Sequence, residues 1–380
     1  MNTNDNDDVD VMTVQSKAPG KVIISGEHAV VYGKPALCFS IDKYTTCTIR
    51  VVKYNSNTNA NANEVFCKCN MPNINETLVI TTTNAYNSNN TNSFMVNHII
   101  SIVNSVLTAM NRTLSELIVY ITEHHCYINI TITSTIPVGF GLGSSAAFNV
   151  SIVLALNTLF AKIFSIQSLS KQTLKTLSNN AEKTFHSTPS GIDVVTSLYG
   201  SFIIFKTIND FIQESNINKF SFITNNYDII LLNTNKSRDC KEFINKVSTF
   251  KKEHFELFQQ NLNDIEGITN NIINIITSYE HNGDDSCLEH SKERFTQLIM
   301  QNQKHLSNIQ VSNDIIDNII KVLHRNGFYN CKITGAGGGG FILVFIEKEN
   351  ICKFNTLCKE ENFNILKVNI DSQGAYVVTQ

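Results

Sequence analysis

The sequence lacks the features that mark secreted, membrane and nucleic-acid-binding proteins. Residues 1–10 are polar and acidic, without the basic, apolar and small-residue segments of a signal peptide. We find no apolar run long enough to span a bilayer. The net charge of −3 gives no electrostatic reason to bind nucleic acid or an acidic membrane. We therefore expect a cytoplasmic protein that has neither nucleic acid nor a membrane as its partner.

Cysteine is present, but without a metal-site or disulfide pattern. The ten cysteines are scattered and include no Cys-X-X-Cys pair. Cys67 and Cys69 are two positions apart and would lie on the same side of a strand. Zinc sites and disulfide frameworks have characteristic spacings that are missing here, so reduced thiols are predicted.

Length and composition predict about two domains with substantial hydrophobic cores. The chain has 380 residues, of which 42% are hydrophobic. Expected strands and helices alternate irregularly, which is typical of an α+β fold rather than of repeating strand–helix–strand units. The polar stretch 207–227 lies between two expected strands, so we place the boundary there, with domains at 11–215 and 225–380. Expected strands include 22–25, 45–52, 118–121, 127–132, 202–205, 228–232, 341–345, 366–369 and 375–378, and expected helices include 98–110, 146–159, 167–185, 241–276 and 288–323.

Two asparagine-rich segments, 55–63 and 84–93, interrupt the first predicted domain. They have few apolar side chains to bury, so we predict that both are solvated loop insertions.

The most informative segment is 139–147, Gly-Phe-Gly-Leu-Gly-Ser-Ser-Ala-Ala, which precedes an apolar run of helical period. Its alternate glycines allow sharp turns and a bare backbone, and Ser144 or Ser145 is expected at the helix N-cap. The free amides and the dipole of a helix N-terminus favour an anion, usually phosphate. The segment differs from the common P-loop because no Lys-Ser or Lys-Thr follows its last glycine. A simple turn that starts a helix is the alternative.

A second segment, 17–33, contains charged residues that a turn does not need. Pro19 and Gly20 break the backbone before an apolar strand, which holds Lys21 at a defined point. Glu27 and His28 stand between glycines, where an acid and an imidazole are difficult to explain as scaffold. The alternative for the lysine is a solvated side chain at the start of a strand.

A third segment, 181–193, supplies two carboxylates. Glu182 lies at the edge of the apolar stripe of its predicted helix, so its side chain can point inward. A turn then brings Asp193 to the start of a short helix, where favourable pairing with the helix dipole is the alternative explanation. His186 is more typical of a loop histidine than of a catalyst.

A fourth segment, 332–341, contains Gly335, Gly337 and Gly340 in a Gly-X-Gly-X-X-Gly spacing. A dinucleotide-binding loop should follow a strand and open a helix, whereas these glycines lead into a strand. The segment is therefore either a bare hairpin or a backbone surface that approaches phosphate.

In this order, the four segments resemble the motifs of the GHMP kinase superfamily, over residues 17 to about 345. The motifs are APGKVIISGEHAVVYGKPAL, IPVGFGLGSSAA, STPSGID and KITGAGGGG. The first is most similar to that of the mevalonate kinases within this superfamily. The resemblance implies a two-domain α+β GHMP kinase fold with the active site in the interdomain cleft. It also implies ATP-dependent phosphorylation of the primary hydroxyl of (R)-mevalonate to 5-phosphomevalonate, an early step of isoprenoid and sterol biosynthesis.

The resemblance also implies roles for individual residues. Asp193 would be the general base, and Lys21 would stabilise the negative charge that develops on the substrate hydroxyl. ATP and Mg²⁺ would be the cofactors, with Ser145 and Glu182 as metal ligands. The implied phosphate loop is Gly139, Phe140, Gly141, Leu142, Gly143, Ser144 and Ser145, and the implied substrate-binding residues are Glu27, His28 and Arg238. A homodimer and inhibition by isoprenoid diphosphates that compete with ATP are further implications.

Two residues depart from the family pattern. Cys240 stands where relatives have threonine, and a thiol is a weaker hydrogen-bond donor than a hydroxyl. Phe148 stands where some relatives have tyrosine. The alternatives to mevalonate phosphorylation are another small-alcohol kinase of the superfamily and a catalytically inactive metabolite sensor. A sensor should have lost the lysine, the metal ligands or the base, and none of these is missing.

Overall fold

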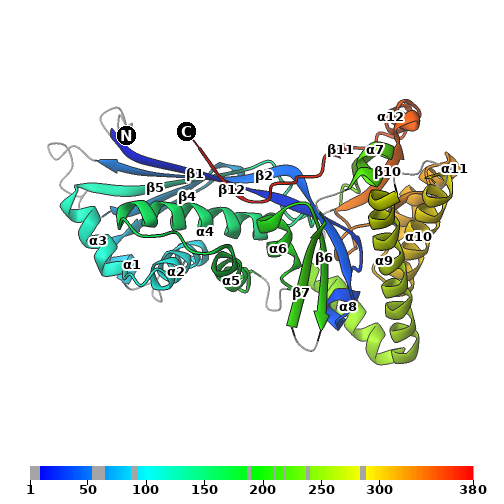
Figure 1. Ribbon diagram of the computed structural model, residues 1–380, viewed down its shortest axis with the longest axis horizontal. Coiled ribbons are helices and arrows are strands. Elements are labelled where there is room, and N and C mark those ends of the chain that lie inside the picture. Colours follow the sequence, from blue (N-terminus) through cyan, green and yellow to red (C-terminus); the bar gives the residue numbers. More distant parts are fainter. Residues whose placement is uncertain are drawn as a thin grey trace.

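The computed structural model describes residues 9–53, 65–86, 93–185, 190–208, 211–217, 220–236, 240–282 and 288–379. The asparagine-rich segment 55–63, His186 and Arg238 lie outside these ranges. The described chain forms two β-sheets, each with its own layer of helices (Figure 1). The predicted α+β class is confirmed.

The first sheet has eight strands and is dominated by two long ones. Its order is β12-β1-β2-β5-β3-β4, with β6 paired to β2 and β7 to β6. The register of β1 against β2 shifts between Pro19 and Gly20, immediately before Lys21. The strands are β1 (Val9–Ser25), β2 (Ala36–Lys53), β3 (Val65–Met71), β4 (Glu76–Thr81), β5 (Cys126–Ser134), β6 (Phe202–Ile208), β7 (Phe211–Ile217) and β12 (Tyr376–Val378).

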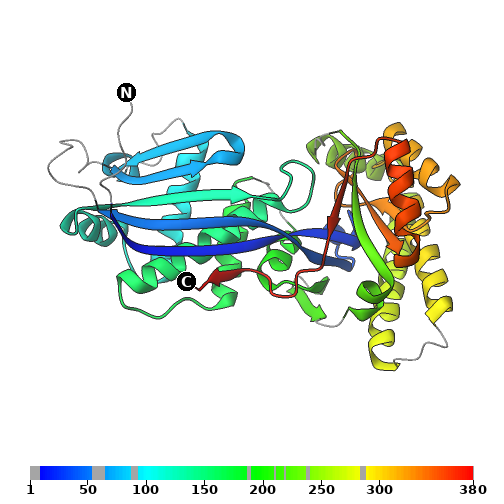
Figure 2. The same cartoon turned by 90° about the horizontal axis from the view of Figure 1, so that it is seen from above.

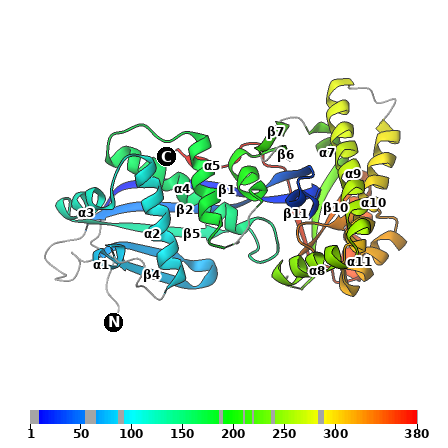
Figure 3. The ribbon, with the colours of Figure 1, turned by 90° about the horizontal axis from the view of Figure 1, so that it is seen from below.

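Helices cover one face of this sheet. Viewed from above, the strands lie in front, and from below the helices do (Figures 2 and 3). The helices are α1 (Thr82–Tyr86), α2 (Phe94–Ala109), α3 (Leu114–Glu123), α4 (Ser144–Ile163), α5 (Lys171–Glu182) and α6 (Ile192–Tyr199), with the 3₁₀ turns η1 (Ala29–Tyr32) and η3 (Pro72–Ile74). The central helix is α4, which contacts β1, β2, α2, α5 and α6.

The position of α4 explains its composition. Within the described ranges it is the single helix that is long and apolar enough to cross a bilayer, apart from the α2–α3 pair, which is bent by 101°. The expectation that no apolar run has this length was therefore wrong. The strands and helices around α4 bury 67% of its apolar stretch. Its apolar composition is therefore that of a core helix.

The second sheet is antiparallel and has the order β11-β8-β10-β9. Its central strands are buried on both faces: in β8, Ile229 and Leu231 belong to one hydrophobic cluster, and Ile230 and Leu232 to another. The elements are β8 (Tyr227–Asn233), β9 (Cys331–Ile333), β10 (Phe341–Glu347), β11 (Ile365–Val368), α7 (Ser221–Asn226), α8 (Cys240–Glu253), α9 (Phe255–Asn282), α10 (Leu288–Asn308), α11 (Asp314–Arg325), α12 (Ile351–Glu360) and the 3₁₀ turn η6 (Lys348–Asn350).

The chain returns from the second sheet to the first at its C-terminal end. Asp371 is the anchor of this return: it accepts hydrogen bonds from the Tyr44 hydroxyl at 2.6 Å and from the backbone amide of Gly374 at 2.6 Å. Beyond it, β12 pairs with β1. The expected boundary stretch 207–227 contains β7 and α7 rather than a plain linker. The domain limits 11–215 and 225–380 stay a prediction.

Two local expectations were wrong. Residues 118–121, expected as a strand, lie in α3, because Thr113 and Glu116 form a capping box that starts a helix. Leu117 and Ile121, four residues apart, are its buried positions. Residues 84–86 of the second asparagine-rich segment belong to α1 rather than to a loop.

Candidate active site

A lysine and an aspartate from distant segments meet beside the glycine loop, residues 139–145. The Lys21 ammonium Nζ lies 3.0 Å from Asp193 Oδ1, and the side chains are 5% and 33% exposed. Lys21 also donates its backbone amide to the Leu142 carbonyl at 2.8 Å. Asp193 lies in the first turn of α6, which Ser197 attaches to β1 by donating its hydroxyl to the Pro19 carbonyl at 2.7 Å. The pair is therefore fixed from both sides and still open to a ligand at the carboxylate.

The glycine loop ends in a helix N-terminus without a side-chain cap. Gly139, Gly141 and Gly143 have φ values of 83°, 82° and 72°, which favour glycine. The N-cap of α4 is Gly143, so the expectation of a serine at this position was wrong. The left-handed Gly143 moves Ser144 and Ser145 into the first turn of the helix. The first amides of α4 consequently have no side-chain acceptor at the cap and suit an anion.

A buried carboxylate lies against the first turn of α4. Glu182 is 2% exposed and accepts hydrogen bonds from the Ser145 hydroxyl at 2.5 Å and from Asn149 Nδ2 at 2.7 Å. Burial raises the pKa of Glu182 to about 7, although these two hydrogen bonds lower it. Asn149 Oδ1 in turn accepts a hydrogen bond from His98 Nε2 at 2.8 Å. Burial lowers the pKa of His98, so its ring is neutral near neutral pH.

Asn149 and His98 were not predicted as site residues from the sequence. Asn149 could have been found as a polar residue in the apolar run 146–159. It lies four positions after Ser145 and therefore on the same helix face. The ring of His98 stacks on that of Phe148, with centroids 6.2 Å apart. Phe148, the departure from the family pattern, thus packs on this chain of polar residues. A cavity of about 740 Å³ between α2 and α5 is also lined by His98.

The Glu182 site fits a hard divalent cation. A hydroxyl and a carboxylate are the oxygen donors that Mg²⁺ prefers. The raised pKa shows that the surroundings disfavour the charged carboxylate, and a bound cation would offset this.

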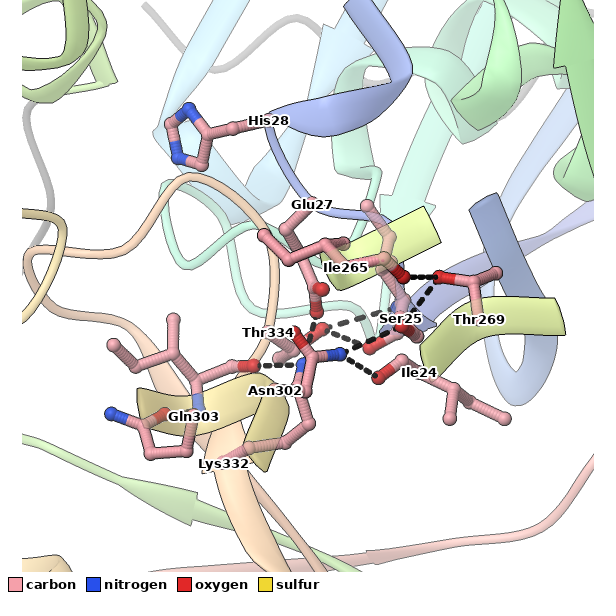
Figure 4. A network of polar contacts seen from close by, with 12 residues as sticks. Ile24, Ser25, Glu27, His28, Ile265, Thr269, Asn302, Gln303, Lys332 and Thr334 are labelled. Atoms are coloured by element: carbon pink, nitrogen blue, oxygen red, sulfur yellow. Dashed lines mark hydrogen bonds and ion pairs between the residues drawn. The ribbon is translucent and has the colours of Figure 1, made fainter. Parts of the chain in front are cut away.

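Glu27 and His28 lie at the junction of the two sheets (Figure 4). The Glu27 carboxylate forms a fully buried ion pair with Lys332, which lies on β9. The ring of His28 donates from Nε2 to the Ala336 carbonyl at 3.0 Å, since a carbonyl oxygen can only accept. No role was predicted for Lys332, because nothing in the sequence pattern shows that a lysine in this segment is buried.

The segment 332–341, which is the third glycine-rich segment of the chain after 17–33 and 139–147, combines packing with proximity to the glycine loop. A Cβ atom at Gly337 would lie 2.3 Å from the Val311 carbonyl oxygen, and one at Gly338 would lie 1.9 Å from the Phe243 ring. These two glycines are therefore required for close packing. At the end of the segment, the ring of Phe341 contacts that of Phe140 in the glycine loop, with centroids 5.5 Å apart.

Two expected site residues cannot be placed in this arrangement. Arg238 lies outside the described residues, and the side chain of Cys240 is not described. The roles of the remaining residues stay predictions, although Lys21, Asp193, Ser145 and Glu182 do lie around the N-terminus of α4.

Two family models match separate parts of the chain. The model for the GHMP kinases N terminal domain matches residues 101–201, and that for the GHMP kinases C terminal matches residues 285–351. The chain belongs to the GHMP kinase family. The first match includes the glycine loop, Glu182 and Asp193, and the second includes the third glycine-rich segment.

Curated relatives of this GHMP kinase are mevalonate kinases. That of Schizosaccharomyces pombe is 26% identical over 373 residues, which cover 93% of this chain and 86% of the relative. That of Arabidopsis thaliana is 27% identical and covers 88% of this chain and 91% of the relative. Among solved structures, Methanococcus jannaschii mevalonate kinase has a TM-score of 0.70 at 23% identity, covering 94% of this chain and 98% of that one. The L. major mevalonate kinase in complex with R-mevalonate has a TM-score of 0.68 at 18% identity, covering 96% and 98%. These structures support the predicted GHMP kinase fold.

Proposed function

We propose that this GHMP kinase transfers the γ-phosphoryl group of ATP to the primary hydroxyl of (R)-mevalonate, giving 5-phosphomevalonate and ADP. The observation that carries the proposal is the Lys21–Asp193 pair beside the uncapped N-terminus of α4. A phosphoryl donor and an acceptor hydroxyl can meet at this point. The mevalonate kinases that are 26–28% identical over most of the chain support the choice of acceptor.

The chemistry assigned to the pair is proton transfer and charge stabilisation. The Asp193 carboxylate accepts the hydroxyl proton as the substrate oxygen forms its bond to the γ-phosphorus, and the bond to the leaving ADP oxygen breaks. The Lys21 ammonium stabilises negative charge on the attacking oxygen. The amides of residues 139–145 and the N-terminus of α4 hold the phosphates.

Ser145 and Glu182 are the residues that would hold Mg²⁺. When bound, the ion would neutralise charge on the phosphate oxygens. Asn149 and His98 orient the Glu182 carboxylate through the hydrogen bonds described above. A cytoplasmic location, a homodimer, inhibition by isoprenoid diphosphates and the absence of nucleic-acid and membrane partners stay predictions.

An ADP-release assay with Mg-ATP tests the proposal. Mevalonate, phosphomevalonate, galactose and homoserine are compared as acceptors, and turnover with mevalonate alone is expected. Turnover with another alcohol instead would mean that mevalonate is not the acceptor, while the proposed reaction type, phosphoryl transfer to an alcohol, would still hold. ATP binding without turnover of any acceptor would favour the metabolite sensor.

The variant Asp193→Asn tests the assigned base. Turnover should be abolished while ATP binding stays nearly intact, because the amide cannot accept the proton. Asp228→Asn is the matched control, since Asp228 also pairs with a lysine, Lys367 at 2.8 Å, but on the second sheet. Substantial turnover by Asp193→Asn would contradict the assignment.

A further inference from the structure

We propose that Lys332 is a positioning residue. Its ion pair with Glu27 holds His28, an expected substrate-binding residue, in a strained turn. This inference deepens the proposed function and rests on it for its kinetic arm. Glu27, expected to bind substrate, then acts through its neighbour instead.

The turn at His28 has a backbone conformation that needs external support. His28 has φ 59° and ψ −42°, and the Ala29 amide donates to the Glu27 carbonyl at 2.6 Å. These features define a three-residue γ-turn of the rare form with positive φ. Such a conformation is strained and persists only when its surroundings enforce it.

Two contacts enforce the turn, and both come from one short segment of the second half of the chain. The Glu27 carboxylate is paired with Lys332, and the His28 ring donates to the Ala336 carbonyl. Lys332 Nζ also donates to the Ile333 carbonyl at 2.5 Å, which fixes the ammonium group on its own strand. The turn is thus attached to β9 at one residue and to the third glycine-rich segment at the next.

Burial makes the ion pair sensitive to the loss of either partner. Both side chains are 0% exposed, and among the residues that the structure describes Glu27 Oε2 has no hydrogen-bond partner. Burial raises the pKa of Glu27 and lowers that of Lys332, and each charge opposes this shift in the other. Removing one partner leaves an uncompensated buried charge, whereas neutralising both removes that penalty.

The surrounding junction has other contacts that hold the two sheets together without this pair (Figure 4). Ser25 forms hydrogen bonds with Thr269 at 2.7 Å and with Asn302 at 2.8 Å. Thr334 donates its hydroxyl to the Ile23 carbonyl at 3.0 Å and accepts from the Ile23 amide at 3.1 Å. Neutralising the ion pair should therefore release the turn while the junction stays intact.

The double variant Glu27→Gln/Lys332→Met separates positioning from stability. Each single variant should lower the midpoint of thermal unfolding, and the double variant should recover most of that loss. If the pair positions His28, the double variant keeps a KM for mevalonate at least tenfold above wild type, with the KM for ATP within twofold. A double variant with a recovered midpoint and a mevalonate KM within twofold of wild type would overturn the proposal.

Glu266→Gln is the matched control. Glu266 on α9 pairs with Lys34 at 2.7 Å, just after the same turn, but both side chains are partly exposed. Its loss should leave both KM values within twofold, because a surface pair does not hold the turn.

Histidine NMR tests the geometry without any acceptor. In ¹⁵N-histidine-labelled protein, with signals assigned through His28→Gln, wild-type His28 should be a single Nε2–H tautomer. The double variant should show averaged tautomers, and averaging already in the wild type would overturn the proposal. If the wild type does not phosphorylate mevalonate, the proposed function fails, and the NMR result still decides the role of Lys332.

Discussion

Replacing Gly143 by alanine should impair catalysis much more than it impairs folding. The residue has φ 72°, so an alanine costs about 1–2 kcal/mol of stability for its left-handed backbone. Its added Cβ would also lie 2.9 Å from Lys21 Cγ, closer than carbon atoms pack. The flexible lysine side chain can move away, which limits the cost in stability but disturbs the 3.0 Å contact of its ammonium with Asp193.

A displacement of about 1 Å at a reacting group can cost about 10²-fold in rate, so we expect kcat to fall by about that factor. The assay is steady-state ADP release with mevalonate, together with urea unfolding of each variant. Gly327→Ala is the control: Gly327 has φ 88°, follows α11 in the second half of the chain, and an added Cβ there would lie 3.6 Å from Lys353 Nζ. It should lose similar stability and keep its kcat.

A third variant, Gly139→Ala, separates the lysine from the phosphate loop. Gly139 has φ 83°, and among the described residues no atom lies within 4 Å of the added Cβ, so Lys21 should stay in place. Its methyl group would instead impede a phosphate, which should raise the KM for ATP. A Gly143→Ala variant that lost no more kcat than Gly327→Ala at equal stability would show that Gly143 does not control the Lys21–Asp193 contact.

Three further predictions follow from the polar groups around the site. In EDTA, the free energy of unfolding should decrease by about 3 kcal/mol as the pH rises from about 4.5 to about 7. The reason is that the pKa of Glu182 is raised to about 7 in the folded state, so the buried neutral carboxyl loses its proton over this range. Glu182→Gln should flatten this pH profile, and an unchanged slope in the variant would contradict the burial argument. Asn149→Leu removes the 2.7 Å hydrogen bond to Glu182, so the Mg²⁺ concentration for half-maximal turnover should rise about tenfold; an unchanged Mg²⁺ titration would argue against a role in orienting the carboxylate. Tyr44→Phe removes the 2.6 Å hydrogen bond to Asp371 and should cost about 1.5–3 kcal/mol in urea unfolding while kcat stays the same; unchanged stability would mean that the hydroxyl is equally well solvated in the unfolded chain.

Much of the fold could be predicted because long elements have clear periodicity. The apolar run 146–159 and the buried strand 341–345 correspond to α4 and β10. The prediction of a strand at 118–121 was wrong because a short apolar run does not show whether its period is that of a strand or of a helix. The capping box at Thr113 starts a helix there instead. The return of the chain to the first sheet could not be foreseen, because strand pairing depends on contacts between residues far apart in the sequence.

The candidate site was predictable where residue types are chemically unusual for their context. Lys21, Glu182 and Asp193 stood out as charges within glycine-rich or apolar segments. Lys332 and His98 did not, because their importance lies in burial and in partners 305 and 51 positions away. The N-cap was misjudged because serine is the common choice, whereas this loop needs a left-handed residue at that point.

The pairing of β12 with β1 has a consequence for how the protein is made. On the ribosome, strands β1 to β7 of the first sheet have all been synthesised once the chain reaches Ile217, whereas β12 begins only at Tyr376. At about 5–20 residues per second, this leaves the partner edge of β1 at Gln15–Lys17 uncovered for roughly 10–30 s. An uncovered edge can pair with another chain. The nascent first half is therefore open to edge-to-edge association until the last strand emerges and closes it.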